Sequence, residues 1–310
     1  MAKKRIQNIV AESRFALPVT AVYALLMSMA CGLAERNLWI QFAVLAVSSY
    51  LMVELNNSNA IIRVYSRMVS CSYIVLFLMS GLLVSPVSSV LTQLCFVVFY
   101  MFFFHAYQNK SSMGLVFYAF LMIGLASTMS VHVFFLVPLM WILLFTNVLA
   151  GNIRTFFASV IGLLFPYWFL ASYHIYTGNP EALAAHFSKL AEFGKLFDHT
   201  VLTDGRIMVL AMLALFMVVG IVHFHRNSYK DKIRTRMIYE IFSITGIYVM
   251  ALLALQPNLY SELTGIMVVN TAPLIAHYIV FTNTRLTNVS FFVIVLSVLL
   301  MTIYGIWMPS

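Results

Sequence analysis

The stretch Gly114–Ala150, GLVFYAFLMIGLASTMSVHVFFLVPLMWILLFTNVLA, decides the fold class, because its 37 residues include no lysine, arginine, aspartate or glutamate. A single helix of that length would run about 55 Å, far more than a bilayer's hydrocarbon core of roughly 30 Å. We therefore predict two membrane-crossing helices that turn near Ser127–Ser130. Backbone groups in lipid must be hydrogen-bonded within each crossing, and the apolar run is continuous rather than alternating. The crossings are therefore helices and not barrel strands.

The whole chain has the same character. Of its 310 residues 62% are hydrophobic and 9% are charged, and the mean hydropathy is +0.94. A soluble domain carries about 25% charged residues, so this chain lacks the side chains needed to coat a surface facing water. We predict an all-α fold, a polytopic transmembrane helical bundle, in which residues 1–310 form a single integral membrane domain.

Polar turns divide the chain into eleven apolar runs, most of them close to the roughly 20 residues that cross a bilayer as a helix. We expect spans at about 15–34, 38–54, 68–84, 90–107, 114–130, 132–150, 156–176, 206–224, 238–256, 263–281 and 288–307.

The positions of lysine and arginine predict the orientation, because cytoplasmic loops carry an excess of both. With the amino terminus in the cytoplasm, 14 of the 18 fall inside and 4 fall outside. The inside group is Lys3, Lys4, Arg5, Arg14, Arg63, Arg67, Lys110, Arg154, Arg226, Lys230, Lys232, Arg234, Arg236 and Arg285, and the outside group is Arg36, Lys189, Lys195 and Arg206. We expect a cytoplasmic N-terminus, a periplasmic C-terminus and a basic excess that faces the membrane surface, not nucleic acid.

The one long connection, Thr177–Gly205, lies outside in this orientation. Asn179 can cap a helix, Pro180 suits its first turn and Glu181 favours the positive end of its dipole. An apolar stripe follows at Leu183, Phe187, Leu190, Phe193 and Phe197. The pattern predicts an amphipathic interfacial helix over about 179–199 that lies on the outer leaflet or covers the mouth of the bundle.

Two inner loops hold candidate sites for lipid head groups. In VELNNSNAIIRVYSRM (Val53–Met68), our first interpretation is a turn capped by asparagines, with Glu54 paired to an arginine, and a head-group site is the second. The candidate residues of that second interpretation are Asn56, Asn57, Asn59, Arg63 and Arg67.

The other inner loop is HFHRNSYKDKIRTR, His223–Arg236. We interpret it first as a topology signal and second as a site for anionic lipid head groups, formed by Arg226, Lys230, Lys232, Arg234 and Arg236. Glu240 stands four residues after Arg236 and is expected to pair with it along the helix.

The tenth span, ELTGIMVVNTAPLIAHYIVF, carries Asn270, Pro273 and His277 on one helical face. Polar groups at that depth are costly to expose to lipid, so the face should point into the bundle. Two interpretations stay open: the residues line a substrate path, or they form hydrogen bonds with a neighbouring helix.

Motifs of catalysis, metal binding and cofactor binding are absent from the sequence. There is no HExxH, GxSxG, P-loop or glycine-rich dinucleotide motif, and Cys31, Cys71 and Cys95 form no CxxC. We expect no metal and no cofactor. The catalytic residues of any activity are unknown, and Glu35, the only acid in the first outer turn, is the single weak candidate.

Two resemblances add to this interpretation. The segment GLASTMSVHVFFLVPLMWILLFTNVLAGNIRTFFASVIGLLFPYW, 124–168, resembles the middle helices of GT-C-type membrane glycosyltransferases. That resemblance implies a polyprenyl-phosphate sugar as substrate and Glu35 as the base. More broadly, ELNNSNAIIRVYSRM, RTFFASVIGLLFPYWF and APLIAHYIVFTNTRLTN resemble uncharacterised multi-pass inner-membrane proteins of Gram-negative bacteria, a family of the domain-of-unknown-function kind.

The sequence therefore favours a multi-pass protein of the bacterial cytoplasmic (inner) membrane without an identifiable catalytic motif. We expect it to contact or handle an envelope lipid, or to serve as a membrane subunit of a larger assembly, so its expected partners are membrane lipids and another membrane protein. A divergent GT-C-like transferase and a small-molecule transporter that uses the Asn270–His277 face are the alternatives.

Overall fold

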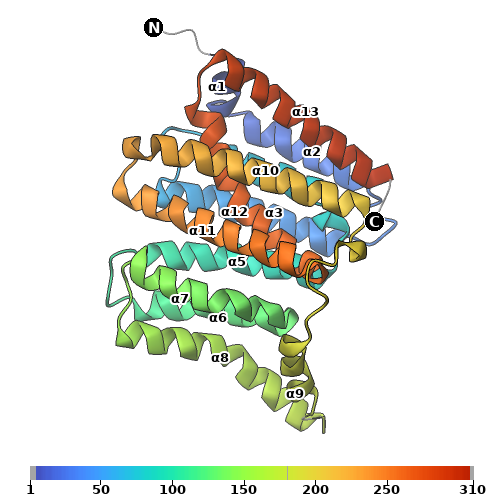
Figure 1. Ribbon diagram of the computed structural model, residues 1–310, viewed down its shortest axis with the longest axis vertical. Helices are drawn as coiled ribbons and strands as arrows, with labels where there is room; N and C mark the ends of the chain where they lie inside the picture. Colours follow the sequence, from blue (N-terminus) through green and yellow to red (C-terminus); the bar gives the residue numbers. More distant parts are fainter. Residues whose placement is uncertain (1–4, 180, 308–310) are drawn as a thin grey trace.

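The computed structural model describes residues 5–179 and 181–307 (Figure 1). Lys3 and Lys4 of the expected cytoplasmic group, and Pro180 of the expected outer helix, lie outside these ranges. Every regular element in the described ranges is a helix, which confirms the all-α prediction.

Within the described ranges, seven helices are long and apolar enough to cross a membrane. They are α3 (Trp39–Asn59), α5 (Val87–His105), α8 (Ile153–Tyr176), α10 (Asp204–Asn227), α11 (Ile233–Leu255), α12 (Tyr260–Phe281) and α13 (Arg285–Trp307). Shorter apolar helices are α2 (Ala16–Ala30), α4 (Met68–Met79), α6 (Met113–Met129) and α7 (Val137–Thr146), the last preceded by the 3-10 segment η2 (Val131–Leu136). Each of the eleven expected spans overlaps one of these helices, while the number that crosses a membrane stays a prediction.

Glycine and proline explain two of the shorter helices. The expected span 68–84 stops being α-helical at Met79, because Gly81 takes a left-handed conformation with φ of +70° and the chain turns there. In the expected span 132–150, Pro138 has no N–H to donate to the carbonyl four residues earlier. The chain before it forms the 3-10 segment η2 instead of an α-helix.

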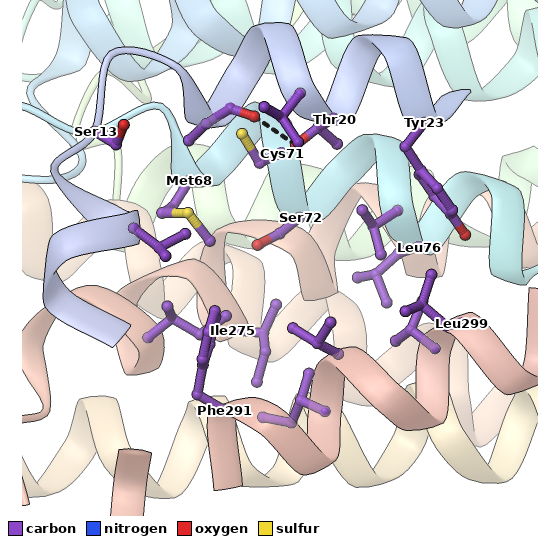
Figure 2. A pocket seen from close by; sticks show the side chains of 18 of the residues that line it. Ser13, Thr20, Tyr23, Met68, Cys71, Ser72, Leu76, Ile275, Phe291 and Leu299 are labelled. Atoms are coloured by element: carbon purple, nitrogen blue, oxygen red, sulfur yellow. Dashed lines mark hydrogen bonds between the residues drawn. The ribbon is translucent and has the colours of Figure 1, made fainter. Parts of the chain in front are cut away.

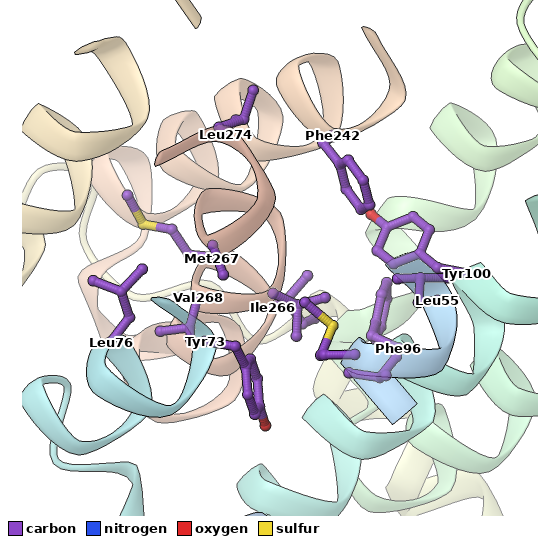
Figure 3. Packing of buried hydrophobic residues seen from close by; sticks show 14 of the residues in the cluster. Leu55, Tyr73, Leu76, Phe96, Tyr100, Phe242, Ile266, Met267, Val268 and Leu274 are labelled. Carbon is purple, nitrogen blue, oxygen red and sulfur yellow. The ribbon is translucent and has the colours of Figure 1, made fainter. Parts of the chain in front are cut away.

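Helix α12 lies at the centre of the bundle and packs against α4, α5, α10 and α11. Figure 3 shows its side chains pointing to different neighbours: Val268 lies near Leu76 of α4, while Ile266 lies on the side of Phe96 and Tyr100. Aromatic rings fill the space between α5 and α11, where Tyr100 stacks on Phe104 at 5.2 Å and meets Phe242 edge to face at 5.1 Å. The core is therefore built around the tenth expected span.

The bundle is elongated, with α2 and α13 along one edge and α6, α7 and α8 along the opposite edge (Figure 1). Helices α6 and α8 approach closely because each has a glycine at the contact. A Cβ on Gly162 would lie 2.5 Å from the Phe117 carbonyl oxygen, and one on Gly124 would lie 2.7 Å from the Leu163 carbonyl oxygen. Small residues that allow such close backbone contact are typical of helix pairs in membranes.

Hydrogen bonds join several loops at one end of the bundle. Arg63 donates to the Lys230 carbonyl at 2.7 Å, Arg234 donates to the Asn59 side chain at 2.7 Å, and Asn152 donates to the Lys110 carbonyl at 2.6 Å. We call this end, formed by residues 60–67, 106–112, 147–152 and 228–232, the basic end. The opposite end is the α9 end, named after α9 (Glu181–Ser188).

The expected helix over 179–199 is shorter in the structure. Helix α9 ends at Ser188 and a 3-10 turn, η3 (Lys189–Ala191), follows it. Beyond this turn the backbone bonds to the connection between α11 and α12: Gln256 donates to the Gly194 carbonyl at 3.2 Å, and the Phe197 N–H donates to the Leu255 carbonyl at 3.1 Å. These contacts replace the hydrogen bonds that a longer helix would make within itself.

Two aromatic side chains of the expected stripe do pack on the bundle. The Phe187 ring lies 5.0 Å from Tyr167 of α8, and the Phe193 ring stacks on Phe135 of η2 at 5.7 Å. The α9 segment is thus attached to the α7–α8 edge.

Candidate functional site

An apolar cavity of about 460 Å³ lies between α2, α4, α12 and α13 and is the first candidate site (Figure 2). Figure 2 shows Ile275, Phe291 and Leu299 on one side of it, with Met68 and Leu76 of α4 facing them. Ligand cavities in proteins occupy roughly 300–1,000 Å³, so this one is large enough for a small molecule or part of a lipid.

The cavity opens sideways between α2 and α13. Its rim includes Phe15 and Val19, which are 76% and 66% exposed, and Val295, which is 40% exposed. Few polar atoms face its interior, and the Thr20 hydroxyl already donates to its own helix, to the Ala16 carbonyl, at 2.7 Å. A hydrocarbon chain matches such a lining, whereas a polar solute would find few hydrogen-bond partners.

A second apolar groove, of about 410 Å³, lies on the other side of α2, between α2, α3 and α4. Arg67, one of the expected head-group residues, lines it at the basic end. Its guanidinium group lies 5.4 Å from the centre of the Tyr65 ring and 3.5 Å from the Asn57 side-chain oxygen. Among the expected head-group arginines, Arg67 thus places a positive charge at the end of an apolar groove.

Asp231 is the centre of a buried polar cluster at the basic end, and its side chain is only 4% exposed. One carboxylate oxygen lies 3.4 Å from an Arg63 nitrogen, and the other lies 3.1 Å from His277 Nε2. The His277 ring also lies 3.3 Å, nitrogen to nitrogen, from His223 of α10. The cluster ties together the α3–α4 loop, α10, α12 and the start of α11.

The three residues of the expected substrate path do not converge on one space. The Tyr100 hydroxyl donates to the Asn270 side-chain oxygen at 2.7 Å, and the Asn270 amide donates to its own helix, to the Ile266 carbonyl, at 2.8 Å. His277 instead meets Asp231, and Pro273 is buried within α12. None of the three lines either groove beside α2. The hydrogen-bonding interpretation therefore has named partners, and the substrate path stays a prediction.

The asparagines of 53–68 form a turn. The Asn56 side chain accepts from the Ile62 N–H at 3.0 Å and donates to the Ser66 carbonyl at 3.4 Å, so it spans the connection from α3 to α4. Asn59 accepts from Arg234 of α11. The ion pair expected for Glu54 is not found among the described residues, because Arg63 pairs with Asp231.

The basic residues of the loop His223–Arg236 form two groups that differ in exposure. Arg226, Lys230 and Lys232 are exposed, while Arg234 and Arg236 are half-buried. Arg234 donates to the Phe104 carbonyl at 3.2 Å as well as to Asn59, which gives it a structural role. Glu240, expected to pair with Arg236, instead accepts from the Asn147 amide at 2.9 Å. The exposed group keeps the charge that a head-group site requires.

Glu35, the weak catalytic candidate, is exposed in the turn between α2 and α3. The turn is tight because Gly32 and Asn37 take positive φ values of +80° and +54°. Glu35 lines neither groove beside α2.

Sequence reasoning missed Asp231 and a second polar cluster, at Glu262. Asp231 is the only carboxylate in the basic loop His223–Arg236, which is a signal that it pairs internally. Glu262 accepts a hydrogen bond from Ser130 and lies 2.9 Å from His132 Nδ1, while His132 Nε2 lies 3.1 Å from the Lys189 carbonyl oxygen. His132 is the only histidine in the uncharged stretch 114–150, and this was its one visible signal.

Comparison of the chain with protein-family models, with curated proteins and with solved structures gives no match.

Proposed function

We propose that this chain is a lipid-handling protein of the bacterial inner membrane, which holds the hydrocarbon chain of an envelope lipid in the cavity between α2, α4, α12 and α13. The observation that carries the proposal is the apolar cavity of about 460 Å³ with its sideways opening between exposed apolar residues. A lipid chain could enter it from the bilayer without crossing water.

The proposal includes eleven crossings, with the N-terminus in the cytoplasm and α9 on the periplasmic side. The hydrogen bonds that join residues 60–67, 106–112, 147–152 and 228–232 at the basic end support this topology, because the expected inner basic residues lie in or beside these loops. Arg36 and Arg206, both of the expected outer group, line a cavity together at the other end.

Such a site is suited to binding a lipid reversibly rather than to holding it permanently. A hydrocarbon chain that moves from the bilayer into the cavity leaves one apolar medium for another, so the hydrophobic effect contributes little to its binding. Affinity must come from the fit of the chain and from the head group, which allows a lipid to enter and leave.

The test uses substitutions that fill the cavity with a larger side chain. Ile294 of α13 lines it, whereas Leu296, two residues later, is 59% exposed and does not line it. We expect Ile294→Trp to reduce the amount of lipid that co-purifies in mild detergent, measured by native mass spectrometry, while Leu296→Trp retains the wild-type amount. Val75→Phe, from the α4 wall, should act like Ile294→Trp. Equal lipid retention by all four proteins would exclude the cavity as the binding site.

The other functions considered from the sequence have no comparable feature. Glu35, Asn270 and His277 line neither groove beside α2, and the last two already have protein partners. The subunit alternative remains compatible with lipid handling, because a partner protein could receive the lipid.

A further inference from the structure

A cavity of about 230 Å³ at the α9 end has a different lining from the apolar cavity. Two arginines face it from separate elements, Arg36 from the turn before α3 and Arg206 from the first turn of α10. Tyr260, Ser261 and Tyr304 add polar groups. We call this cavity the arginine mouth.

The arginine mouth lies next to the apolar cavity along helices α4 and α13. On α4, Leu76 lines the apolar cavity and Met79, one helical turn later, lines the mouth. On α13, Val298 and Met301 have the same relation. Three residues of a helix rise about 4.5 Å, so less than one turn separates the lining of one cavity from that of the other on both helices.

Neither arginine pairs with a carboxylate among the residues that the structure describes. Glu35 stands next to Arg36 in the sequence and Asp204 precedes Arg206 by two residues, yet the ion pairs of the described ranges include neither guanidinium group. The Arg206 guanidinium lies 5.3 Å from the centre of the Tyr260 ring, which favours one orientation of the side chain. Two unpaired guanidinium groups beside one small cavity are suited to an anion, and arginine binds phosphate oxygens in a bidentate manner.

We propose that the arginine mouth binds the phosphate of an anionic lipid head group while the chain of the same lipid lies in the apolar cavity. The inference rests on the proposed function and adds to it the charge of the lipid and the end from which the lipid is held. Arg36 and Arg206 are the residues that select it.

The dimensions agree with one lipid in both cavities. Along α13 the combined lining runs from Phe291 to Gly305, which corresponds to about 21 Å at the helical rise. Half of a bilayer's hydrocarbon core measures about 15 Å. A chain held by its phosphate at the α9 end would therefore reach past the middle of the membrane. Gly81 and Gly205 keep the mouth open, since neither places a side chain in it.

The experiment compares the retention of two lipids by the 310-residue chain. Phosphatidylglycerol carries a net negative charge and phosphatidylcholine does not, so their retention ratio in native mass spectrometry measures charge selection. We expect the wild type to prefer phosphatidylglycerol, and Arg36→Gln with Arg206→Gln to lower the ratio about tenfold, since each basic group near a membrane surface favours anionic lipid. Lys189→Gln with Lys195→Gln removes two charges from the same end, outside the mouth, and should leave the ratio unchanged.

Two further variants separate charge from geometry and from folding. Arg36→Lys with Arg206→Lys keeps both charges but loses the planar donor pair, so an intermediate ratio is expected. Arg36→Gln alone changes an exposed side chain, which should not impair folding, and should lower the ratio by a smaller factor. An unchanged ratio in Arg36→Gln and in the double glutamine variant overturns the inference.

The same measurements distinguish the inference from the proposed function. If Ile294→Trp leaves retention of both lipids unchanged, the cavity proposal fails first. If Ile294→Trp lowers both but the arginine variants do not alter the ratio, only the head-group inference fails. A last arm uses inorganic phosphate in detergent. If phosphate raises the thermal midpoint of the wild type but not of the double glutamine variant, while the lipid ratio is equal in both, the mouth is a free-phosphate site and the lipid assignment is wrong.

Discussion

Helices α12 and α13 follow each other in the chain and have 22 and 23 residues, yet their environments are opposite. In its most apolar window 94% of α12 is buried, against 17% of α13. The more buried helix is the less apolar one, with a mean hydropathy of 1.5 in that window against 2.5 for α13. Water-soluble proteins show the reverse trend, because there the hydrophobic effect decides burial.

Hydrogen bonding explains the difference. Asn270 and His277 of α12 bind Tyr100 of α5 and Asp231 before α11, so α12 must lie among other helices. In α13 such contacts lie at its start, where Asn288 accepts from the Gln7 N–H and the Ser290 hydroxyl meets that of Tyr278. Further along α13, the hydroxyl groups of Ser297 and Thr302 donate to carbonyls of their own helix. Since lipid is as apolar as leucine, α13 gains little from being enclosed, while the polar side chains of α12 would be costly to expose.

Removal of Asp231 should be the largest disturbance to this arrangement. Asp231→Ala leaves His277 of α12 and the Arg63 guanidinium without their shared partner. Leaving a buried polar group unsatisfied costs about 1–3 kcal/mol, and more where a charged group is involved. We expect a marked fall in the thermal midpoint in detergent, measured by intrinsic fluorescence. Asp204→Asn, at an exposed carboxylate, is the control and should leave the midpoint nearly unchanged. Equal midpoints for both variants would contradict the role assigned to hydrogen bonding.

Two glycine substitutions test the difference between α12 and α13 without changing a polar group. A Cβ on Gly220 of α10 would lie 2.7 Å from Leu274 Cβ and 2.8 Å from the Leu274 carbonyl carbon in α12, whereas a Cβ on Gly305 of α13 meets nothing within 4 Å. Overpacking of a close contact costs about 1–3 kcal/mol, so Gly220→Ala should lower the thermal midpoint. Gly305→Ala should leave it unchanged or raise it slightly, because alanine is the better helix former. A larger fall for Gly305→Ala would mean that α13 is not the peripheral helix.

Loss of one hydrogen bond should have a smaller effect. Tyr100→Phe removes the donor to Asn270 and keeps the ring contacts with Phe104 and Phe242. Hydrogen bonds between membrane helices contribute about 0.6 kcal/mol on average, with a maximum near 1.7. We expect Tyr100→Phe to lower the free energy of unfolding by an amount in that range, measured in a reversible unfolding titration. Tyr118→Phe, at a tyrosine that is 49% exposed, is the matched control. An equal loss of stability in Tyr118→Phe would show that the hydrogen bond to Asn270 does not explain the effect of Tyr100→Phe.

The sequence predicted helices well but could not predict which helix is central. Apolar runs such as 263–281 and 288–307 correspond to α12 and α13 within a few residues, because a crossing helix must be continuous and apolar. In lipid, however, apolar character does not distinguish the interior from the edge. The polar stripe at Asn270 and His277 was the only sequence signal for the centre, and it indicated burial without identifying the partners.

The candidate site was less predictable still. The apolar cavity is lined by residues from six of the described helices, among them Thr20, Cys71, Phe216, Ile275 and Val298, and nothing in their spacing relates one helix to another. Arg36 and Arg206 are 170 positions apart in the chain and differ in no local feature from topology-setting arginines. Their common cavity exists because the turn before α3 lies near the start of α10.

The smallest predicted effect concerns the α9 segment, which, like α13, is attached at an edge of the bundle. His186 Nε2 lies 3.1 Å from the Ser127 carbonyl and 3.3 Å from the Tyr167 hydroxyl. Burial, followed by the charges of Lys189 and His174, lowers the pKa of His186 below its ordinary value of 6.5, although the Ser127 carbonyl raises it in part. A detached α9 therefore binds the proton more readily than an attached one, so attachment is strongest above that ordinary value and weakens as the pH falls toward the lowered pKa.

Hydrogen exchange of residues 181–191, corrected for the intrinsic effect of pH, should therefore speed up as the pH falls from about 7.5 to about 5.5. His186→Gln should remove most of this dependence, because no titrating group then faces Ser127. His105→Gln, at an exposed histidine at the end of α5, should keep it. An undiminished pH dependence in His186→Gln would contradict the assignment to His186. His132, whose Nε2 meets the Lys189 carbonyl in the same segment, would not explain such a result, because protonation of His132 strengthens its contacts with the Glu262 carboxylate and with that carbonyl.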